Sequence, residues 1–402
     1  MAERNIGRLM QGWLRAEAET ADFVMWAACF FLSLAQWHHV AYFFSNDFYR
    51  SVQAEQGILT GYPHWRFFQS RVLGPWLEKA LSVIFGFNLG VAHIIVAIVM
   101  LTLCGAVMFY AGRAIGGRQS GWSALLAFHI LFALMMARPW LYIWDYFVLL
   151  AAAVFMLLMV RRAPWWSFLL LMSVAFFNHE SALFIGVWMV AKALTDAWAE
   201  RRHPDWWLLG SGALGSLGGQ LLIEFLRHAL LNREIGWELF NDVGKRPTGQ
   251  LNNYFHVQFT TNLHDIFQWI IHPDANLLFV QVLPLVLALV LAVMLVVRHG
   301  VGGVPLAIYA VTQFVALLLL AYIPETRTLL QLVPFLCLGG MLVANADWLK
   351  SERAGAGEQS VPPNLRADMR EPALDKLEAR RPQVSRIDTD PRRRIDVARM
   401  KP

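Results

Sequence analysis

Four arginines lie in gaps between the long apolar runs of this chain, among acids: Arg66, Arg71, Arg138 and Arg327. An arginine guanidinium keeps its charge and binds phosphate through two parallel N–H groups. Ionisable groups at the edge of hydrocarbon are costly and are usually kept there for a function. Around one cavity, such residues would bind a phosphate or pyrophosphate leaving group and stabilise the charge that grows as its bond breaks.

Ion pairing with nearby acids is the alternative for two of these arginines. Glu325 stands close before Arg327, and Asp145 follows Arg138 across a tight turn. Asp145 is predicted just inside an apolar helix, where an acid needs a cation or a set of hydrogen-bond donors. Structural pairing and a part in the site therefore stay equally open for Asp145. The other two arginines lie in a loop that has few acids.

Asp47 directly follows the first apolar run. A carboxylate at the mouth of a helix bundle could act as a general base and take a proton from an acceptor hydroxyl. A helix-end cap or an ordinary loop acid is the alternative, and Asp47 considered alone favours it. Glu55 is the other acid nearby.

Asn178, His179 and Glu180 interrupt another apolar run. The interruption has the length of a simple turn between helices, but such turns seldom need both a histidine and a glutamate beside hydrocarbon. The pair is adjacent and lacks the spacing that places two metal ligands on one helical face. Hydrogen bonding to a substrate or to an arginine is therefore favoured over a divalent metal site, and no cofactor is expected.

Apolar helices must position these residues, and the composition predicts them. The 402 residues are 57% hydrophobic and 16% charged, whereas a soluble domain carries about a quarter charged residues. Because a spanning helix needs about 20 apolar residues, the chain is predicted to be an all-α polytopic membrane protein with about ten spans. They lie near 22–44, 88–112, 120–137, 141–160, 164–178, 181–198, 206–223, 276–297, 304–323 and 328–346.

Basic residues predict the orientation. Arginines flank the gaps after the even-numbered spans, so both termini are expected in the cytoplasm of a bacterium, with the chain crossing its inner (cytoplasmic) membrane many times. The predicted parts are a cytoplasmic segment 1–20, a transmembrane domain 21–346 with outer loops 45–87 and 224–275, and a disordered cytoplasmic tail 347–402. Interfacial helices are expected in the first outer loop, with a break at Gly74–Pro75. The expected partner is the lipid bilayer, and no nucleic acid is expected.

Several of these features together resemble the GT-C glycosyltransferases, a superfamily of polytopic membrane enzymes. The resemblance covers about residues 20–346 and rests on the acid after the first span, the segment 68–77, the turn with Asp145, the turn 178–181, and the segment 324–327 with Pro334 downstream. Many members have two acids in the first outer loop, whereas Asn46-Asp47 offers one carboxylate.

The resemblance implies transfer of a sugar from a polyprenyl-phosphate carrier to an acceptor, which the sequence does not identify, on the outer face of the membrane. It implies that Asp47 acts on the acceptor and that Arg71, Arg138 and Arg327 hold the lipid phosphate. The substrate site is expected to include also Arg66, Asp145, Asn178, His179, Glu180 and Glu325. One base and a phosphate leaving group suffice for a direct, inverting displacement.

Two other functions are alternatives to sugar transfer from a polyprenyl-phosphate carrier. A polysaccharide polymerase acting on undecaprenyl-diphosphate-linked repeats would need the same outer arginines and a longer acceptor groove. A secondary transporter or flippase would need polar residues near the middle of the bilayer. The middles of the predicted spans are almost wholly Leu, Val, Ala and Phe, so transport is the least favoured function.

Overall fold

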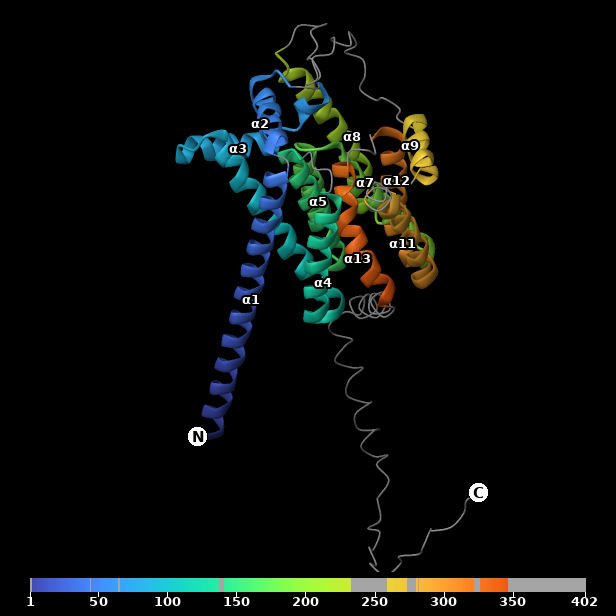
Figure 1. Ribbon diagram of the computed structural model, residues 1–402. Helices are drawn as coiled ribbons and strands as arrows, with labels where there is room; N and C mark the ends of the chain where they lie inside the picture. The colour runs from blue at the N-terminus through green and yellow to red at the C-terminus, as the bar shows by residue number, and fades with distance from the viewer. Residues whose placement is uncertain are drawn as a thin grey trace, which may run out of the picture. The chain divides into compact units, whose positions relative to one another are not determined.

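The computed structural model describes residues 2–43, 45–63, 66–136, 141–232, 259–272, 280, 282–321 and 326–345; the side chains of residues 2–21, 43, 46, 47, 66, 67 and 326 fall outside that description. All regular structure in these ranges is helical, without a strand (Figure 1). The all-α prediction is therefore confirmed for the described residues. The calls on the tail 347–402 and on residues 233–258 of the second outer loop lie outside the described residues.

The longer helices are α1 (Ala2–Phe43), α2 (Ser45–Thr60), α3 (Leu73–Phe85), α4 (Leu89–Met135), α5 (Ile143–Val160), α6 (Trp165–Phe176), α7 (Leu183–Glu200), α8 (Trp206–Ala229), α9 (Phe259–Ile271), α11 (Leu283–His299), α12 (Val304–Leu320) and α13 (Val333–Ala344). Short 3-10 turns join some of them: η1 (Arg66–Ser70), η2 (Glu180–Ala182), η4 (Gly300–Gly303) and η5 (Thr326–Leu332). Helix α4 packs against α1, α5 and α13, and α7 packs against α8 and α12.

Helix α4 is a hairpin of two helices, since the chain reverses at Gly116 and Gly117. Gly117 has φ 80° and ψ −169°, a backbone conformation open only to glycine. Across the hairpin, a Cβ atom added at Gly121 would lie 2.9 Å from the carbonyl oxygen of Phe109. The two arms correspond to the predicted spans 88–112 and 120–137.

Aromatic rings and small residues join the central helices. The ring of Phe155 on α5 stacks on Tyr309 of α12 at 4.5 Å and meets Trp188 of α7 edge-on at 5.3 Å. Gly186 and Gly212 bring α7 and α8 close together, because a Cβ at either one would lie 2.8 Å from the carbonyl oxygen of the other. Such close packing associates helices in lipid, where hydrophobic burial gives no driving force.

Six segments of the described residues are long and apolar enough to cross a membrane: Asp22–Tyr42, Leu89–Met135, Ile143–Val160, Glu180–Glu200, Leu283–Leu320 and Arg327–Ala344. The second and fifth each overlap two of the predicted spans. Helix α6 is apolar but shorter. Helix α8 is not among the six, although Leu214, Leu217, Leu221 and Phe225 are exposed along it. The described residues are thus consistent with an all-α membrane protein, and ten crossings remain a prediction.

The predicted break in the first outer loop is at a different place in the structure. The expected break at Gly74–Pro75 is wrong, because both residues lie in the first turn of α3. Proline is tolerated there, since the first N–H groups of a helix have no intrahelical acceptor. The chain breaks instead at Arg71 and Val72, between η1 and α3.

Candidate functional site

Arg71 lies at this break, buried beneath aromatic rings. Its guanidinium carbon is 4.8 Å from the ring centroid of Phe68 and 5.7 Å from that of Trp144. The backbone N–H groups of Val72 and Leu73 both donate to the carbonyl oxygen of Phe177, at 3.0 Å. These two bonds fasten the η1–α3 break to the turn that follows α6.

That turn carries Asn178, His179 and Glu180. Asn178 is buried and donates from Nδ2 to the carbonyl oxygen of Trp144 at 2.8 Å. Nδ1 of His179 accepts the backbone N–H of Ser181 at 3.0 Å and caps η2. Glu180 Oε2 pairs with Nη2 of Arg71 at 3.6 Å. These contacts hold the turn in place, with the Glu180 carboxylate against Arg71.

Arg227 of α8 is the second arginine on Glu180. It is 3% exposed, contacts Glu180 Oε1 through Nη2, and pairs through Nη1 with Glu224 at 2.7 Å. Arg227 is absent from the predicted site because the seventh predicted span ends at residue 223 and the next residues are predicted to be a loop. The spacing of Glu224 and Arg227, three apart and thus on one helical face, was a usable signal.

Asp145 and Arg327 form the other part of the group. Asp145 lies in the first turn of α5, where Oδ2 accepts the backbone N–H of Tyr142 at 2.9 Å. The same oxygen pairs with Nη1 of Arg327 at 3.4 Å. The guanidinium carbon of Arg327, from η5, lies 4.6 Å from the ring centroid of Tyr142. Asp145 is thus held at a helix N-terminus, which favours negative charge.

These pairs form one group, called here the arginine cluster: Arg71, Asp145, Glu180, Arg227 and Arg327. Burial lowers the pKa of Arg71, and the carboxylates of Glu180 and Asp145 act in the opposite direction. Burial first, and then the charge of Arg71, lower the pKa of His179 to about 3. His179 is therefore neutral at physiological pH, as its role as acceptor requires.

A small, partly open pocket lies beside the turn that carries Glu180, with enclosed space for about one water molecule. Asn178, His179 and Ser181 lie at its polar part, together with Gln313 and Gln331. The rest of its lining is mainly apolar and comes from α5, α6, η2, α7 and α12: Val148, Ala151, Ala152, Ala175, Ala182, Phe184, Ile185 and Tyr309. The lining thus combines hydrogen-bonding side chains with apolar ones.

The side chains of four predicted site residues fall outside the part of the chain that the structure describes. Asp47 lies in the first turn of α2 and Arg66 begins η1, but both side chains fall outside the described residues, as do Arg138 and Glu325 entirely. The structure brings together the other six predicted residues, which lie in or beside the arginine cluster. Asp47 as general base remains a prediction.

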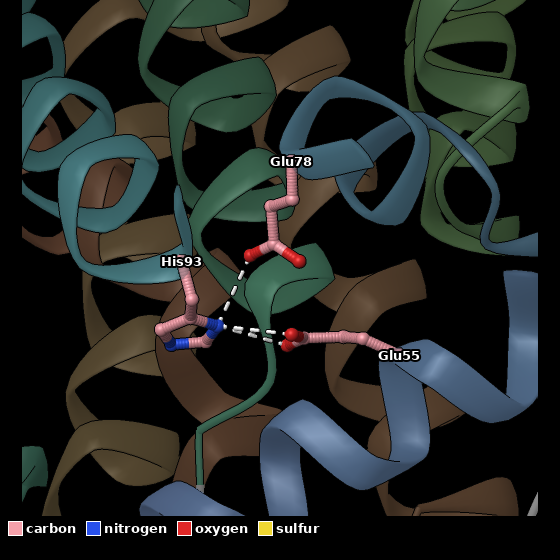
Figure 2. A group of neighbouring side chains, drawn as sticks. All are labelled: Glu55, Glu78 and His93. Atoms are coloured by element: carbon pink, nitrogen blue, oxygen red, sulfur yellow. Dashed lines mark hydrogen bonds and ion pairs between the residues drawn. The ribbon is translucent and has the colours of Figure 1, made fainter. Parts of the chain in front are cut away.

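A second group of ionisable residues lies nearby and was largely missed: Glu55 of α2, Glu78 of α3 and His93 of α4 (Figure 2). Nδ1 of His93 lies 3.0 Å from both Glu55 Oε1 and Glu78 Oε1. Burial, and then the charge of Glu55, raise the pKa of Glu78 to about 9. The sequence analysis noted only Glu55. The usable signal was a histidine and a glutamate placed within apolar helical patterns.

Comparison of the chain with protein-family models, curated proteins and solved structures finds no match. The resemblance to the GT-C superfamily therefore rests on the sequence features described above. The geometry of the arginine cluster carries the functional argument.

Proposed function

We propose that this chain is a membrane glycosyltransferase that moves a sugar from a polyprenyl-phosphate carrier to an acceptor on the extracytoplasmic face. The observation that supports this most is the convergence of Arg71, Arg227 and Arg327 from three distant segments, beside a small pocket with a mainly apolar lining. The arginines suit the carrier phosphate, and the apolar side chains beside them suit contact with a prenyl chain.

The carboxylates of the arginine cluster position its cations. Glu180 contacts Arg71 and Arg227, and Asp145 contacts Arg327. Glu224 at the edge balances the third formal positive charge. Each guanidinium presents five N–H donors in a planar fork, a geometry that suits phosphate oxygens as well as carboxylates. Guanidinium groups held in place before the reaction stabilise growing negative charge without having to reorganise.

The proposed reaction is a single displacement at the anomeric carbon. The carboxylate of Asp47 takes the proton of the acceptor hydroxyl, whose oxygen forms the new bond to that carbon. The bond from the carbon to the phosphate oxygen breaks, and the phosphate leaves with the electron pair. The configuration inverts, and the arginines stabilise the leaving phosphate.

Replacement of Arg327 by lysine tests whether its guanidinium binds the carrier phosphate. Arg327→Lys keeps the charge but loses the bidentate geometry. We expect kcat/KM for the lipid-linked sugar to fall about 10²–10³-fold, as for loss of one hydrogen-bond donor to a developing anion.

Asp47→Asn should abolish transfer while the protein still accumulates in the membrane. Arg113→Lys is the matched control for Arg327→Lys, since Arg113 is half-exposed and pairs with Asp22.

The donor can be identified in lipid extracts of a strain that lacks the protein. An accumulating polyprenyl-monophosphate sugar supports the proposal, and purified protein should then transfer that sugar. Accumulation of diphosphate-linked oligosaccharide repeats would indicate the polymerase instead. Wild-type turnover in both Arg327→Lys and Asp47→Asn would overturn the assignment.

A further inference from the structure

Glu55, Glu78 and His93 come from three different helices and lie together in the interior (Figure 2). Glu55 and Glu78 are 0% exposed and His93 is 3% exposed. One potential ligand atom from each residue lies within 4.8 Å of the others. Two buried carboxylates side by side repel each other, so this arrangement needs a positive charge or a proton between them.

The described residues offer too few donors for these carboxylates. Nδ1 of His93 carries at most one hydrogen, yet it faces Oε1 of Glu55 at 3.0 Å, Oε2 of Glu55 at 3.1 Å and Oε1 of Glu78 at 3.0 Å. Apart from that ion pair, neither oxygen of Glu78 has a hydrogen-bond partner among the described residues. A fully buried carboxylate in that condition is costly. Glu78 therefore points to a ligand between the three side chains.

The spacing and the donor types fit a transition metal. Bonds of about 2.0–2.1 Å in a tetrahedral zinc site place neighbouring ligand atoms about 3.3 Å apart. The observed N···O distances of 3.0 Å need to open by only a few tenths of an ångström. Imidazole suits zinc and its neighbours, whereas magnesium and calcium require more oxygen ligands and usually water. The backbone N–H of Ile143 donates to Glu55 Oε1 at 3.2 Å and helps to orient that carboxylate.

We propose that Glu55, Glu78 and His93 bind a divalent transition metal of the zinc class, which joins α2 and α3 to α4. The ion has a structural role because all three ligands are buried. Through Glu55 and Ile143 it also steadies the first turn of α5, two residues before Asp145. This inference does not depend on sugar transfer, so either proposal can fail while the other stands.

Metal content of the purified full-length chain tests the inference. The protein in detergent is stripped with a chelator, dialysed against buffered zinc chloride and analysed for zinc and protein. We expect about one zinc per chain, and zinc should raise the thermal unfolding midpoint of the stripped protein. Glu78→Gln and His93→Gln should each lose most of the zinc and most of the rise.

His129→Gln is the matched control. His129 lies on the same element α4, is 3% exposed, and its ring nitrogens have no hydrogen-bond partner among the described residues. It should retain wild-type zinc. Folded wild-type protein that binds neither zinc nor manganese above the level of His93→Gln would overturn the proposal and leave a proton-sharing cluster. If the variants fail to fold, the zinc content of the wild-type chain and the zinc-dependent shift of its thermal unfolding midpoint still test the proposal.

Discussion

Glu180 determines the geometry of the arginine cluster more than any other single residue. Its two carboxylate oxygens contact two different arginines, Arg71 and Arg227, which come from the η1–α3 break and from α8. Both arginine side chains are more than nine-tenths buried, whereas that of Glu180 is 27% exposed. Removal of the carboxylate charge would leave two buried cations facing each other. Breaking a buried ion pair by removing one partner is costly because the charge that remains is buried without compensation.

Glu180→Gln should therefore destabilise the protein strongly. We expect the free energy of unfolding to fall by about 3 kcal/mol, because Gln keeps the shape of the side chain but not its charge. The measurement is equilibrium unfolding in mixed detergent micelles.

Glu224→Gln is the paired control for this prediction. Glu224 contacts the same Arg227, but its side chain is 45% exposed, so its loss should change the free energy by about 0.5 kcal/mol. Equal losses in the two variants would contradict the central place of Glu180.

At the scale of elements, the reversal in α4 decides how its two arms pack. Gly117 has positive φ, and a Cβ added there would meet no atom within 4 Å. Any effect of a side chain at this position therefore comes from backbone strain and not from a clash. His93 lies near the start of the first arm, beside Glu55 and at the opposite end from the reversal.

Gly117→Ala should lower the free energy of unfolding by about 1–3 kcal/mol through that strain. Thermal unfolding in detergent measures the change. Gly340→Ala in α13 is the control, since its added Cβ also meets nothing within 4 Å and Gly340 has no positive φ. Alanine is the better helix former, so that variant should be unchanged or slightly more stable. A harmless Gly117→Ala would mean that the turn relaxes at no cost.

The sequence predicted the long apolar helices better than it predicted the helices within the first outer loop. Apolar runs were long enough to find both arms of α4 and also α5. Pro75 was misread as a break because it stands inside an amphipathic pattern, whereas the structure uses it in a first turn, where proline fits. Helix α2 was not predicted, since its sequence mixes polar and apolar residues without a long apolar run.

The partners within the two clusters could not be read from the sequence. The sequence offered Glu325, two residues away, as the acid for Arg327, and that pairing lies outside the described residues. The structure shows Arg327 paired with Asp145, 182 positions earlier in the chain. Arg71 finds its carboxylate on the turn after α6. Such pairings depend on which helix ends meet, and local spacing carries no information on that.

At the scale of the whole helical unit, Met1–Trp348, the two clusters share one end. Glu55 binds the N–H of Ile143 at the start of α5, two residues before Asp145. The Gly116–Gly117 turn lies about 40 Å from Leu89, given a rise of about 1.5 Å per residue. Asn345, just after α13, donates to the carbonyl oxygen of Ile115 at 2.6 Å, so it lies beside that turn. The sugar-transfer proposal requires these two ends to face opposite sides of the membrane, with the clusters outside.

Labelling of introduced cysteines tests this sidedness. Cys29, Cys104 and Cys337 are buried and should not react, so they can remain. Tyr62→Cys, just after α2, should react with a membrane-impermeant maleimide in intact cells whose outer barrier has been opened, because Tyr62 is 48% exposed. Arg118→Cys, beside the α4 turn and also exposed, should react only after the inner membrane is permeabilised. The opposite pattern would place the arginine cluster in the cytoplasm, and an outer-face lipid-phosphate donor could then not reach it.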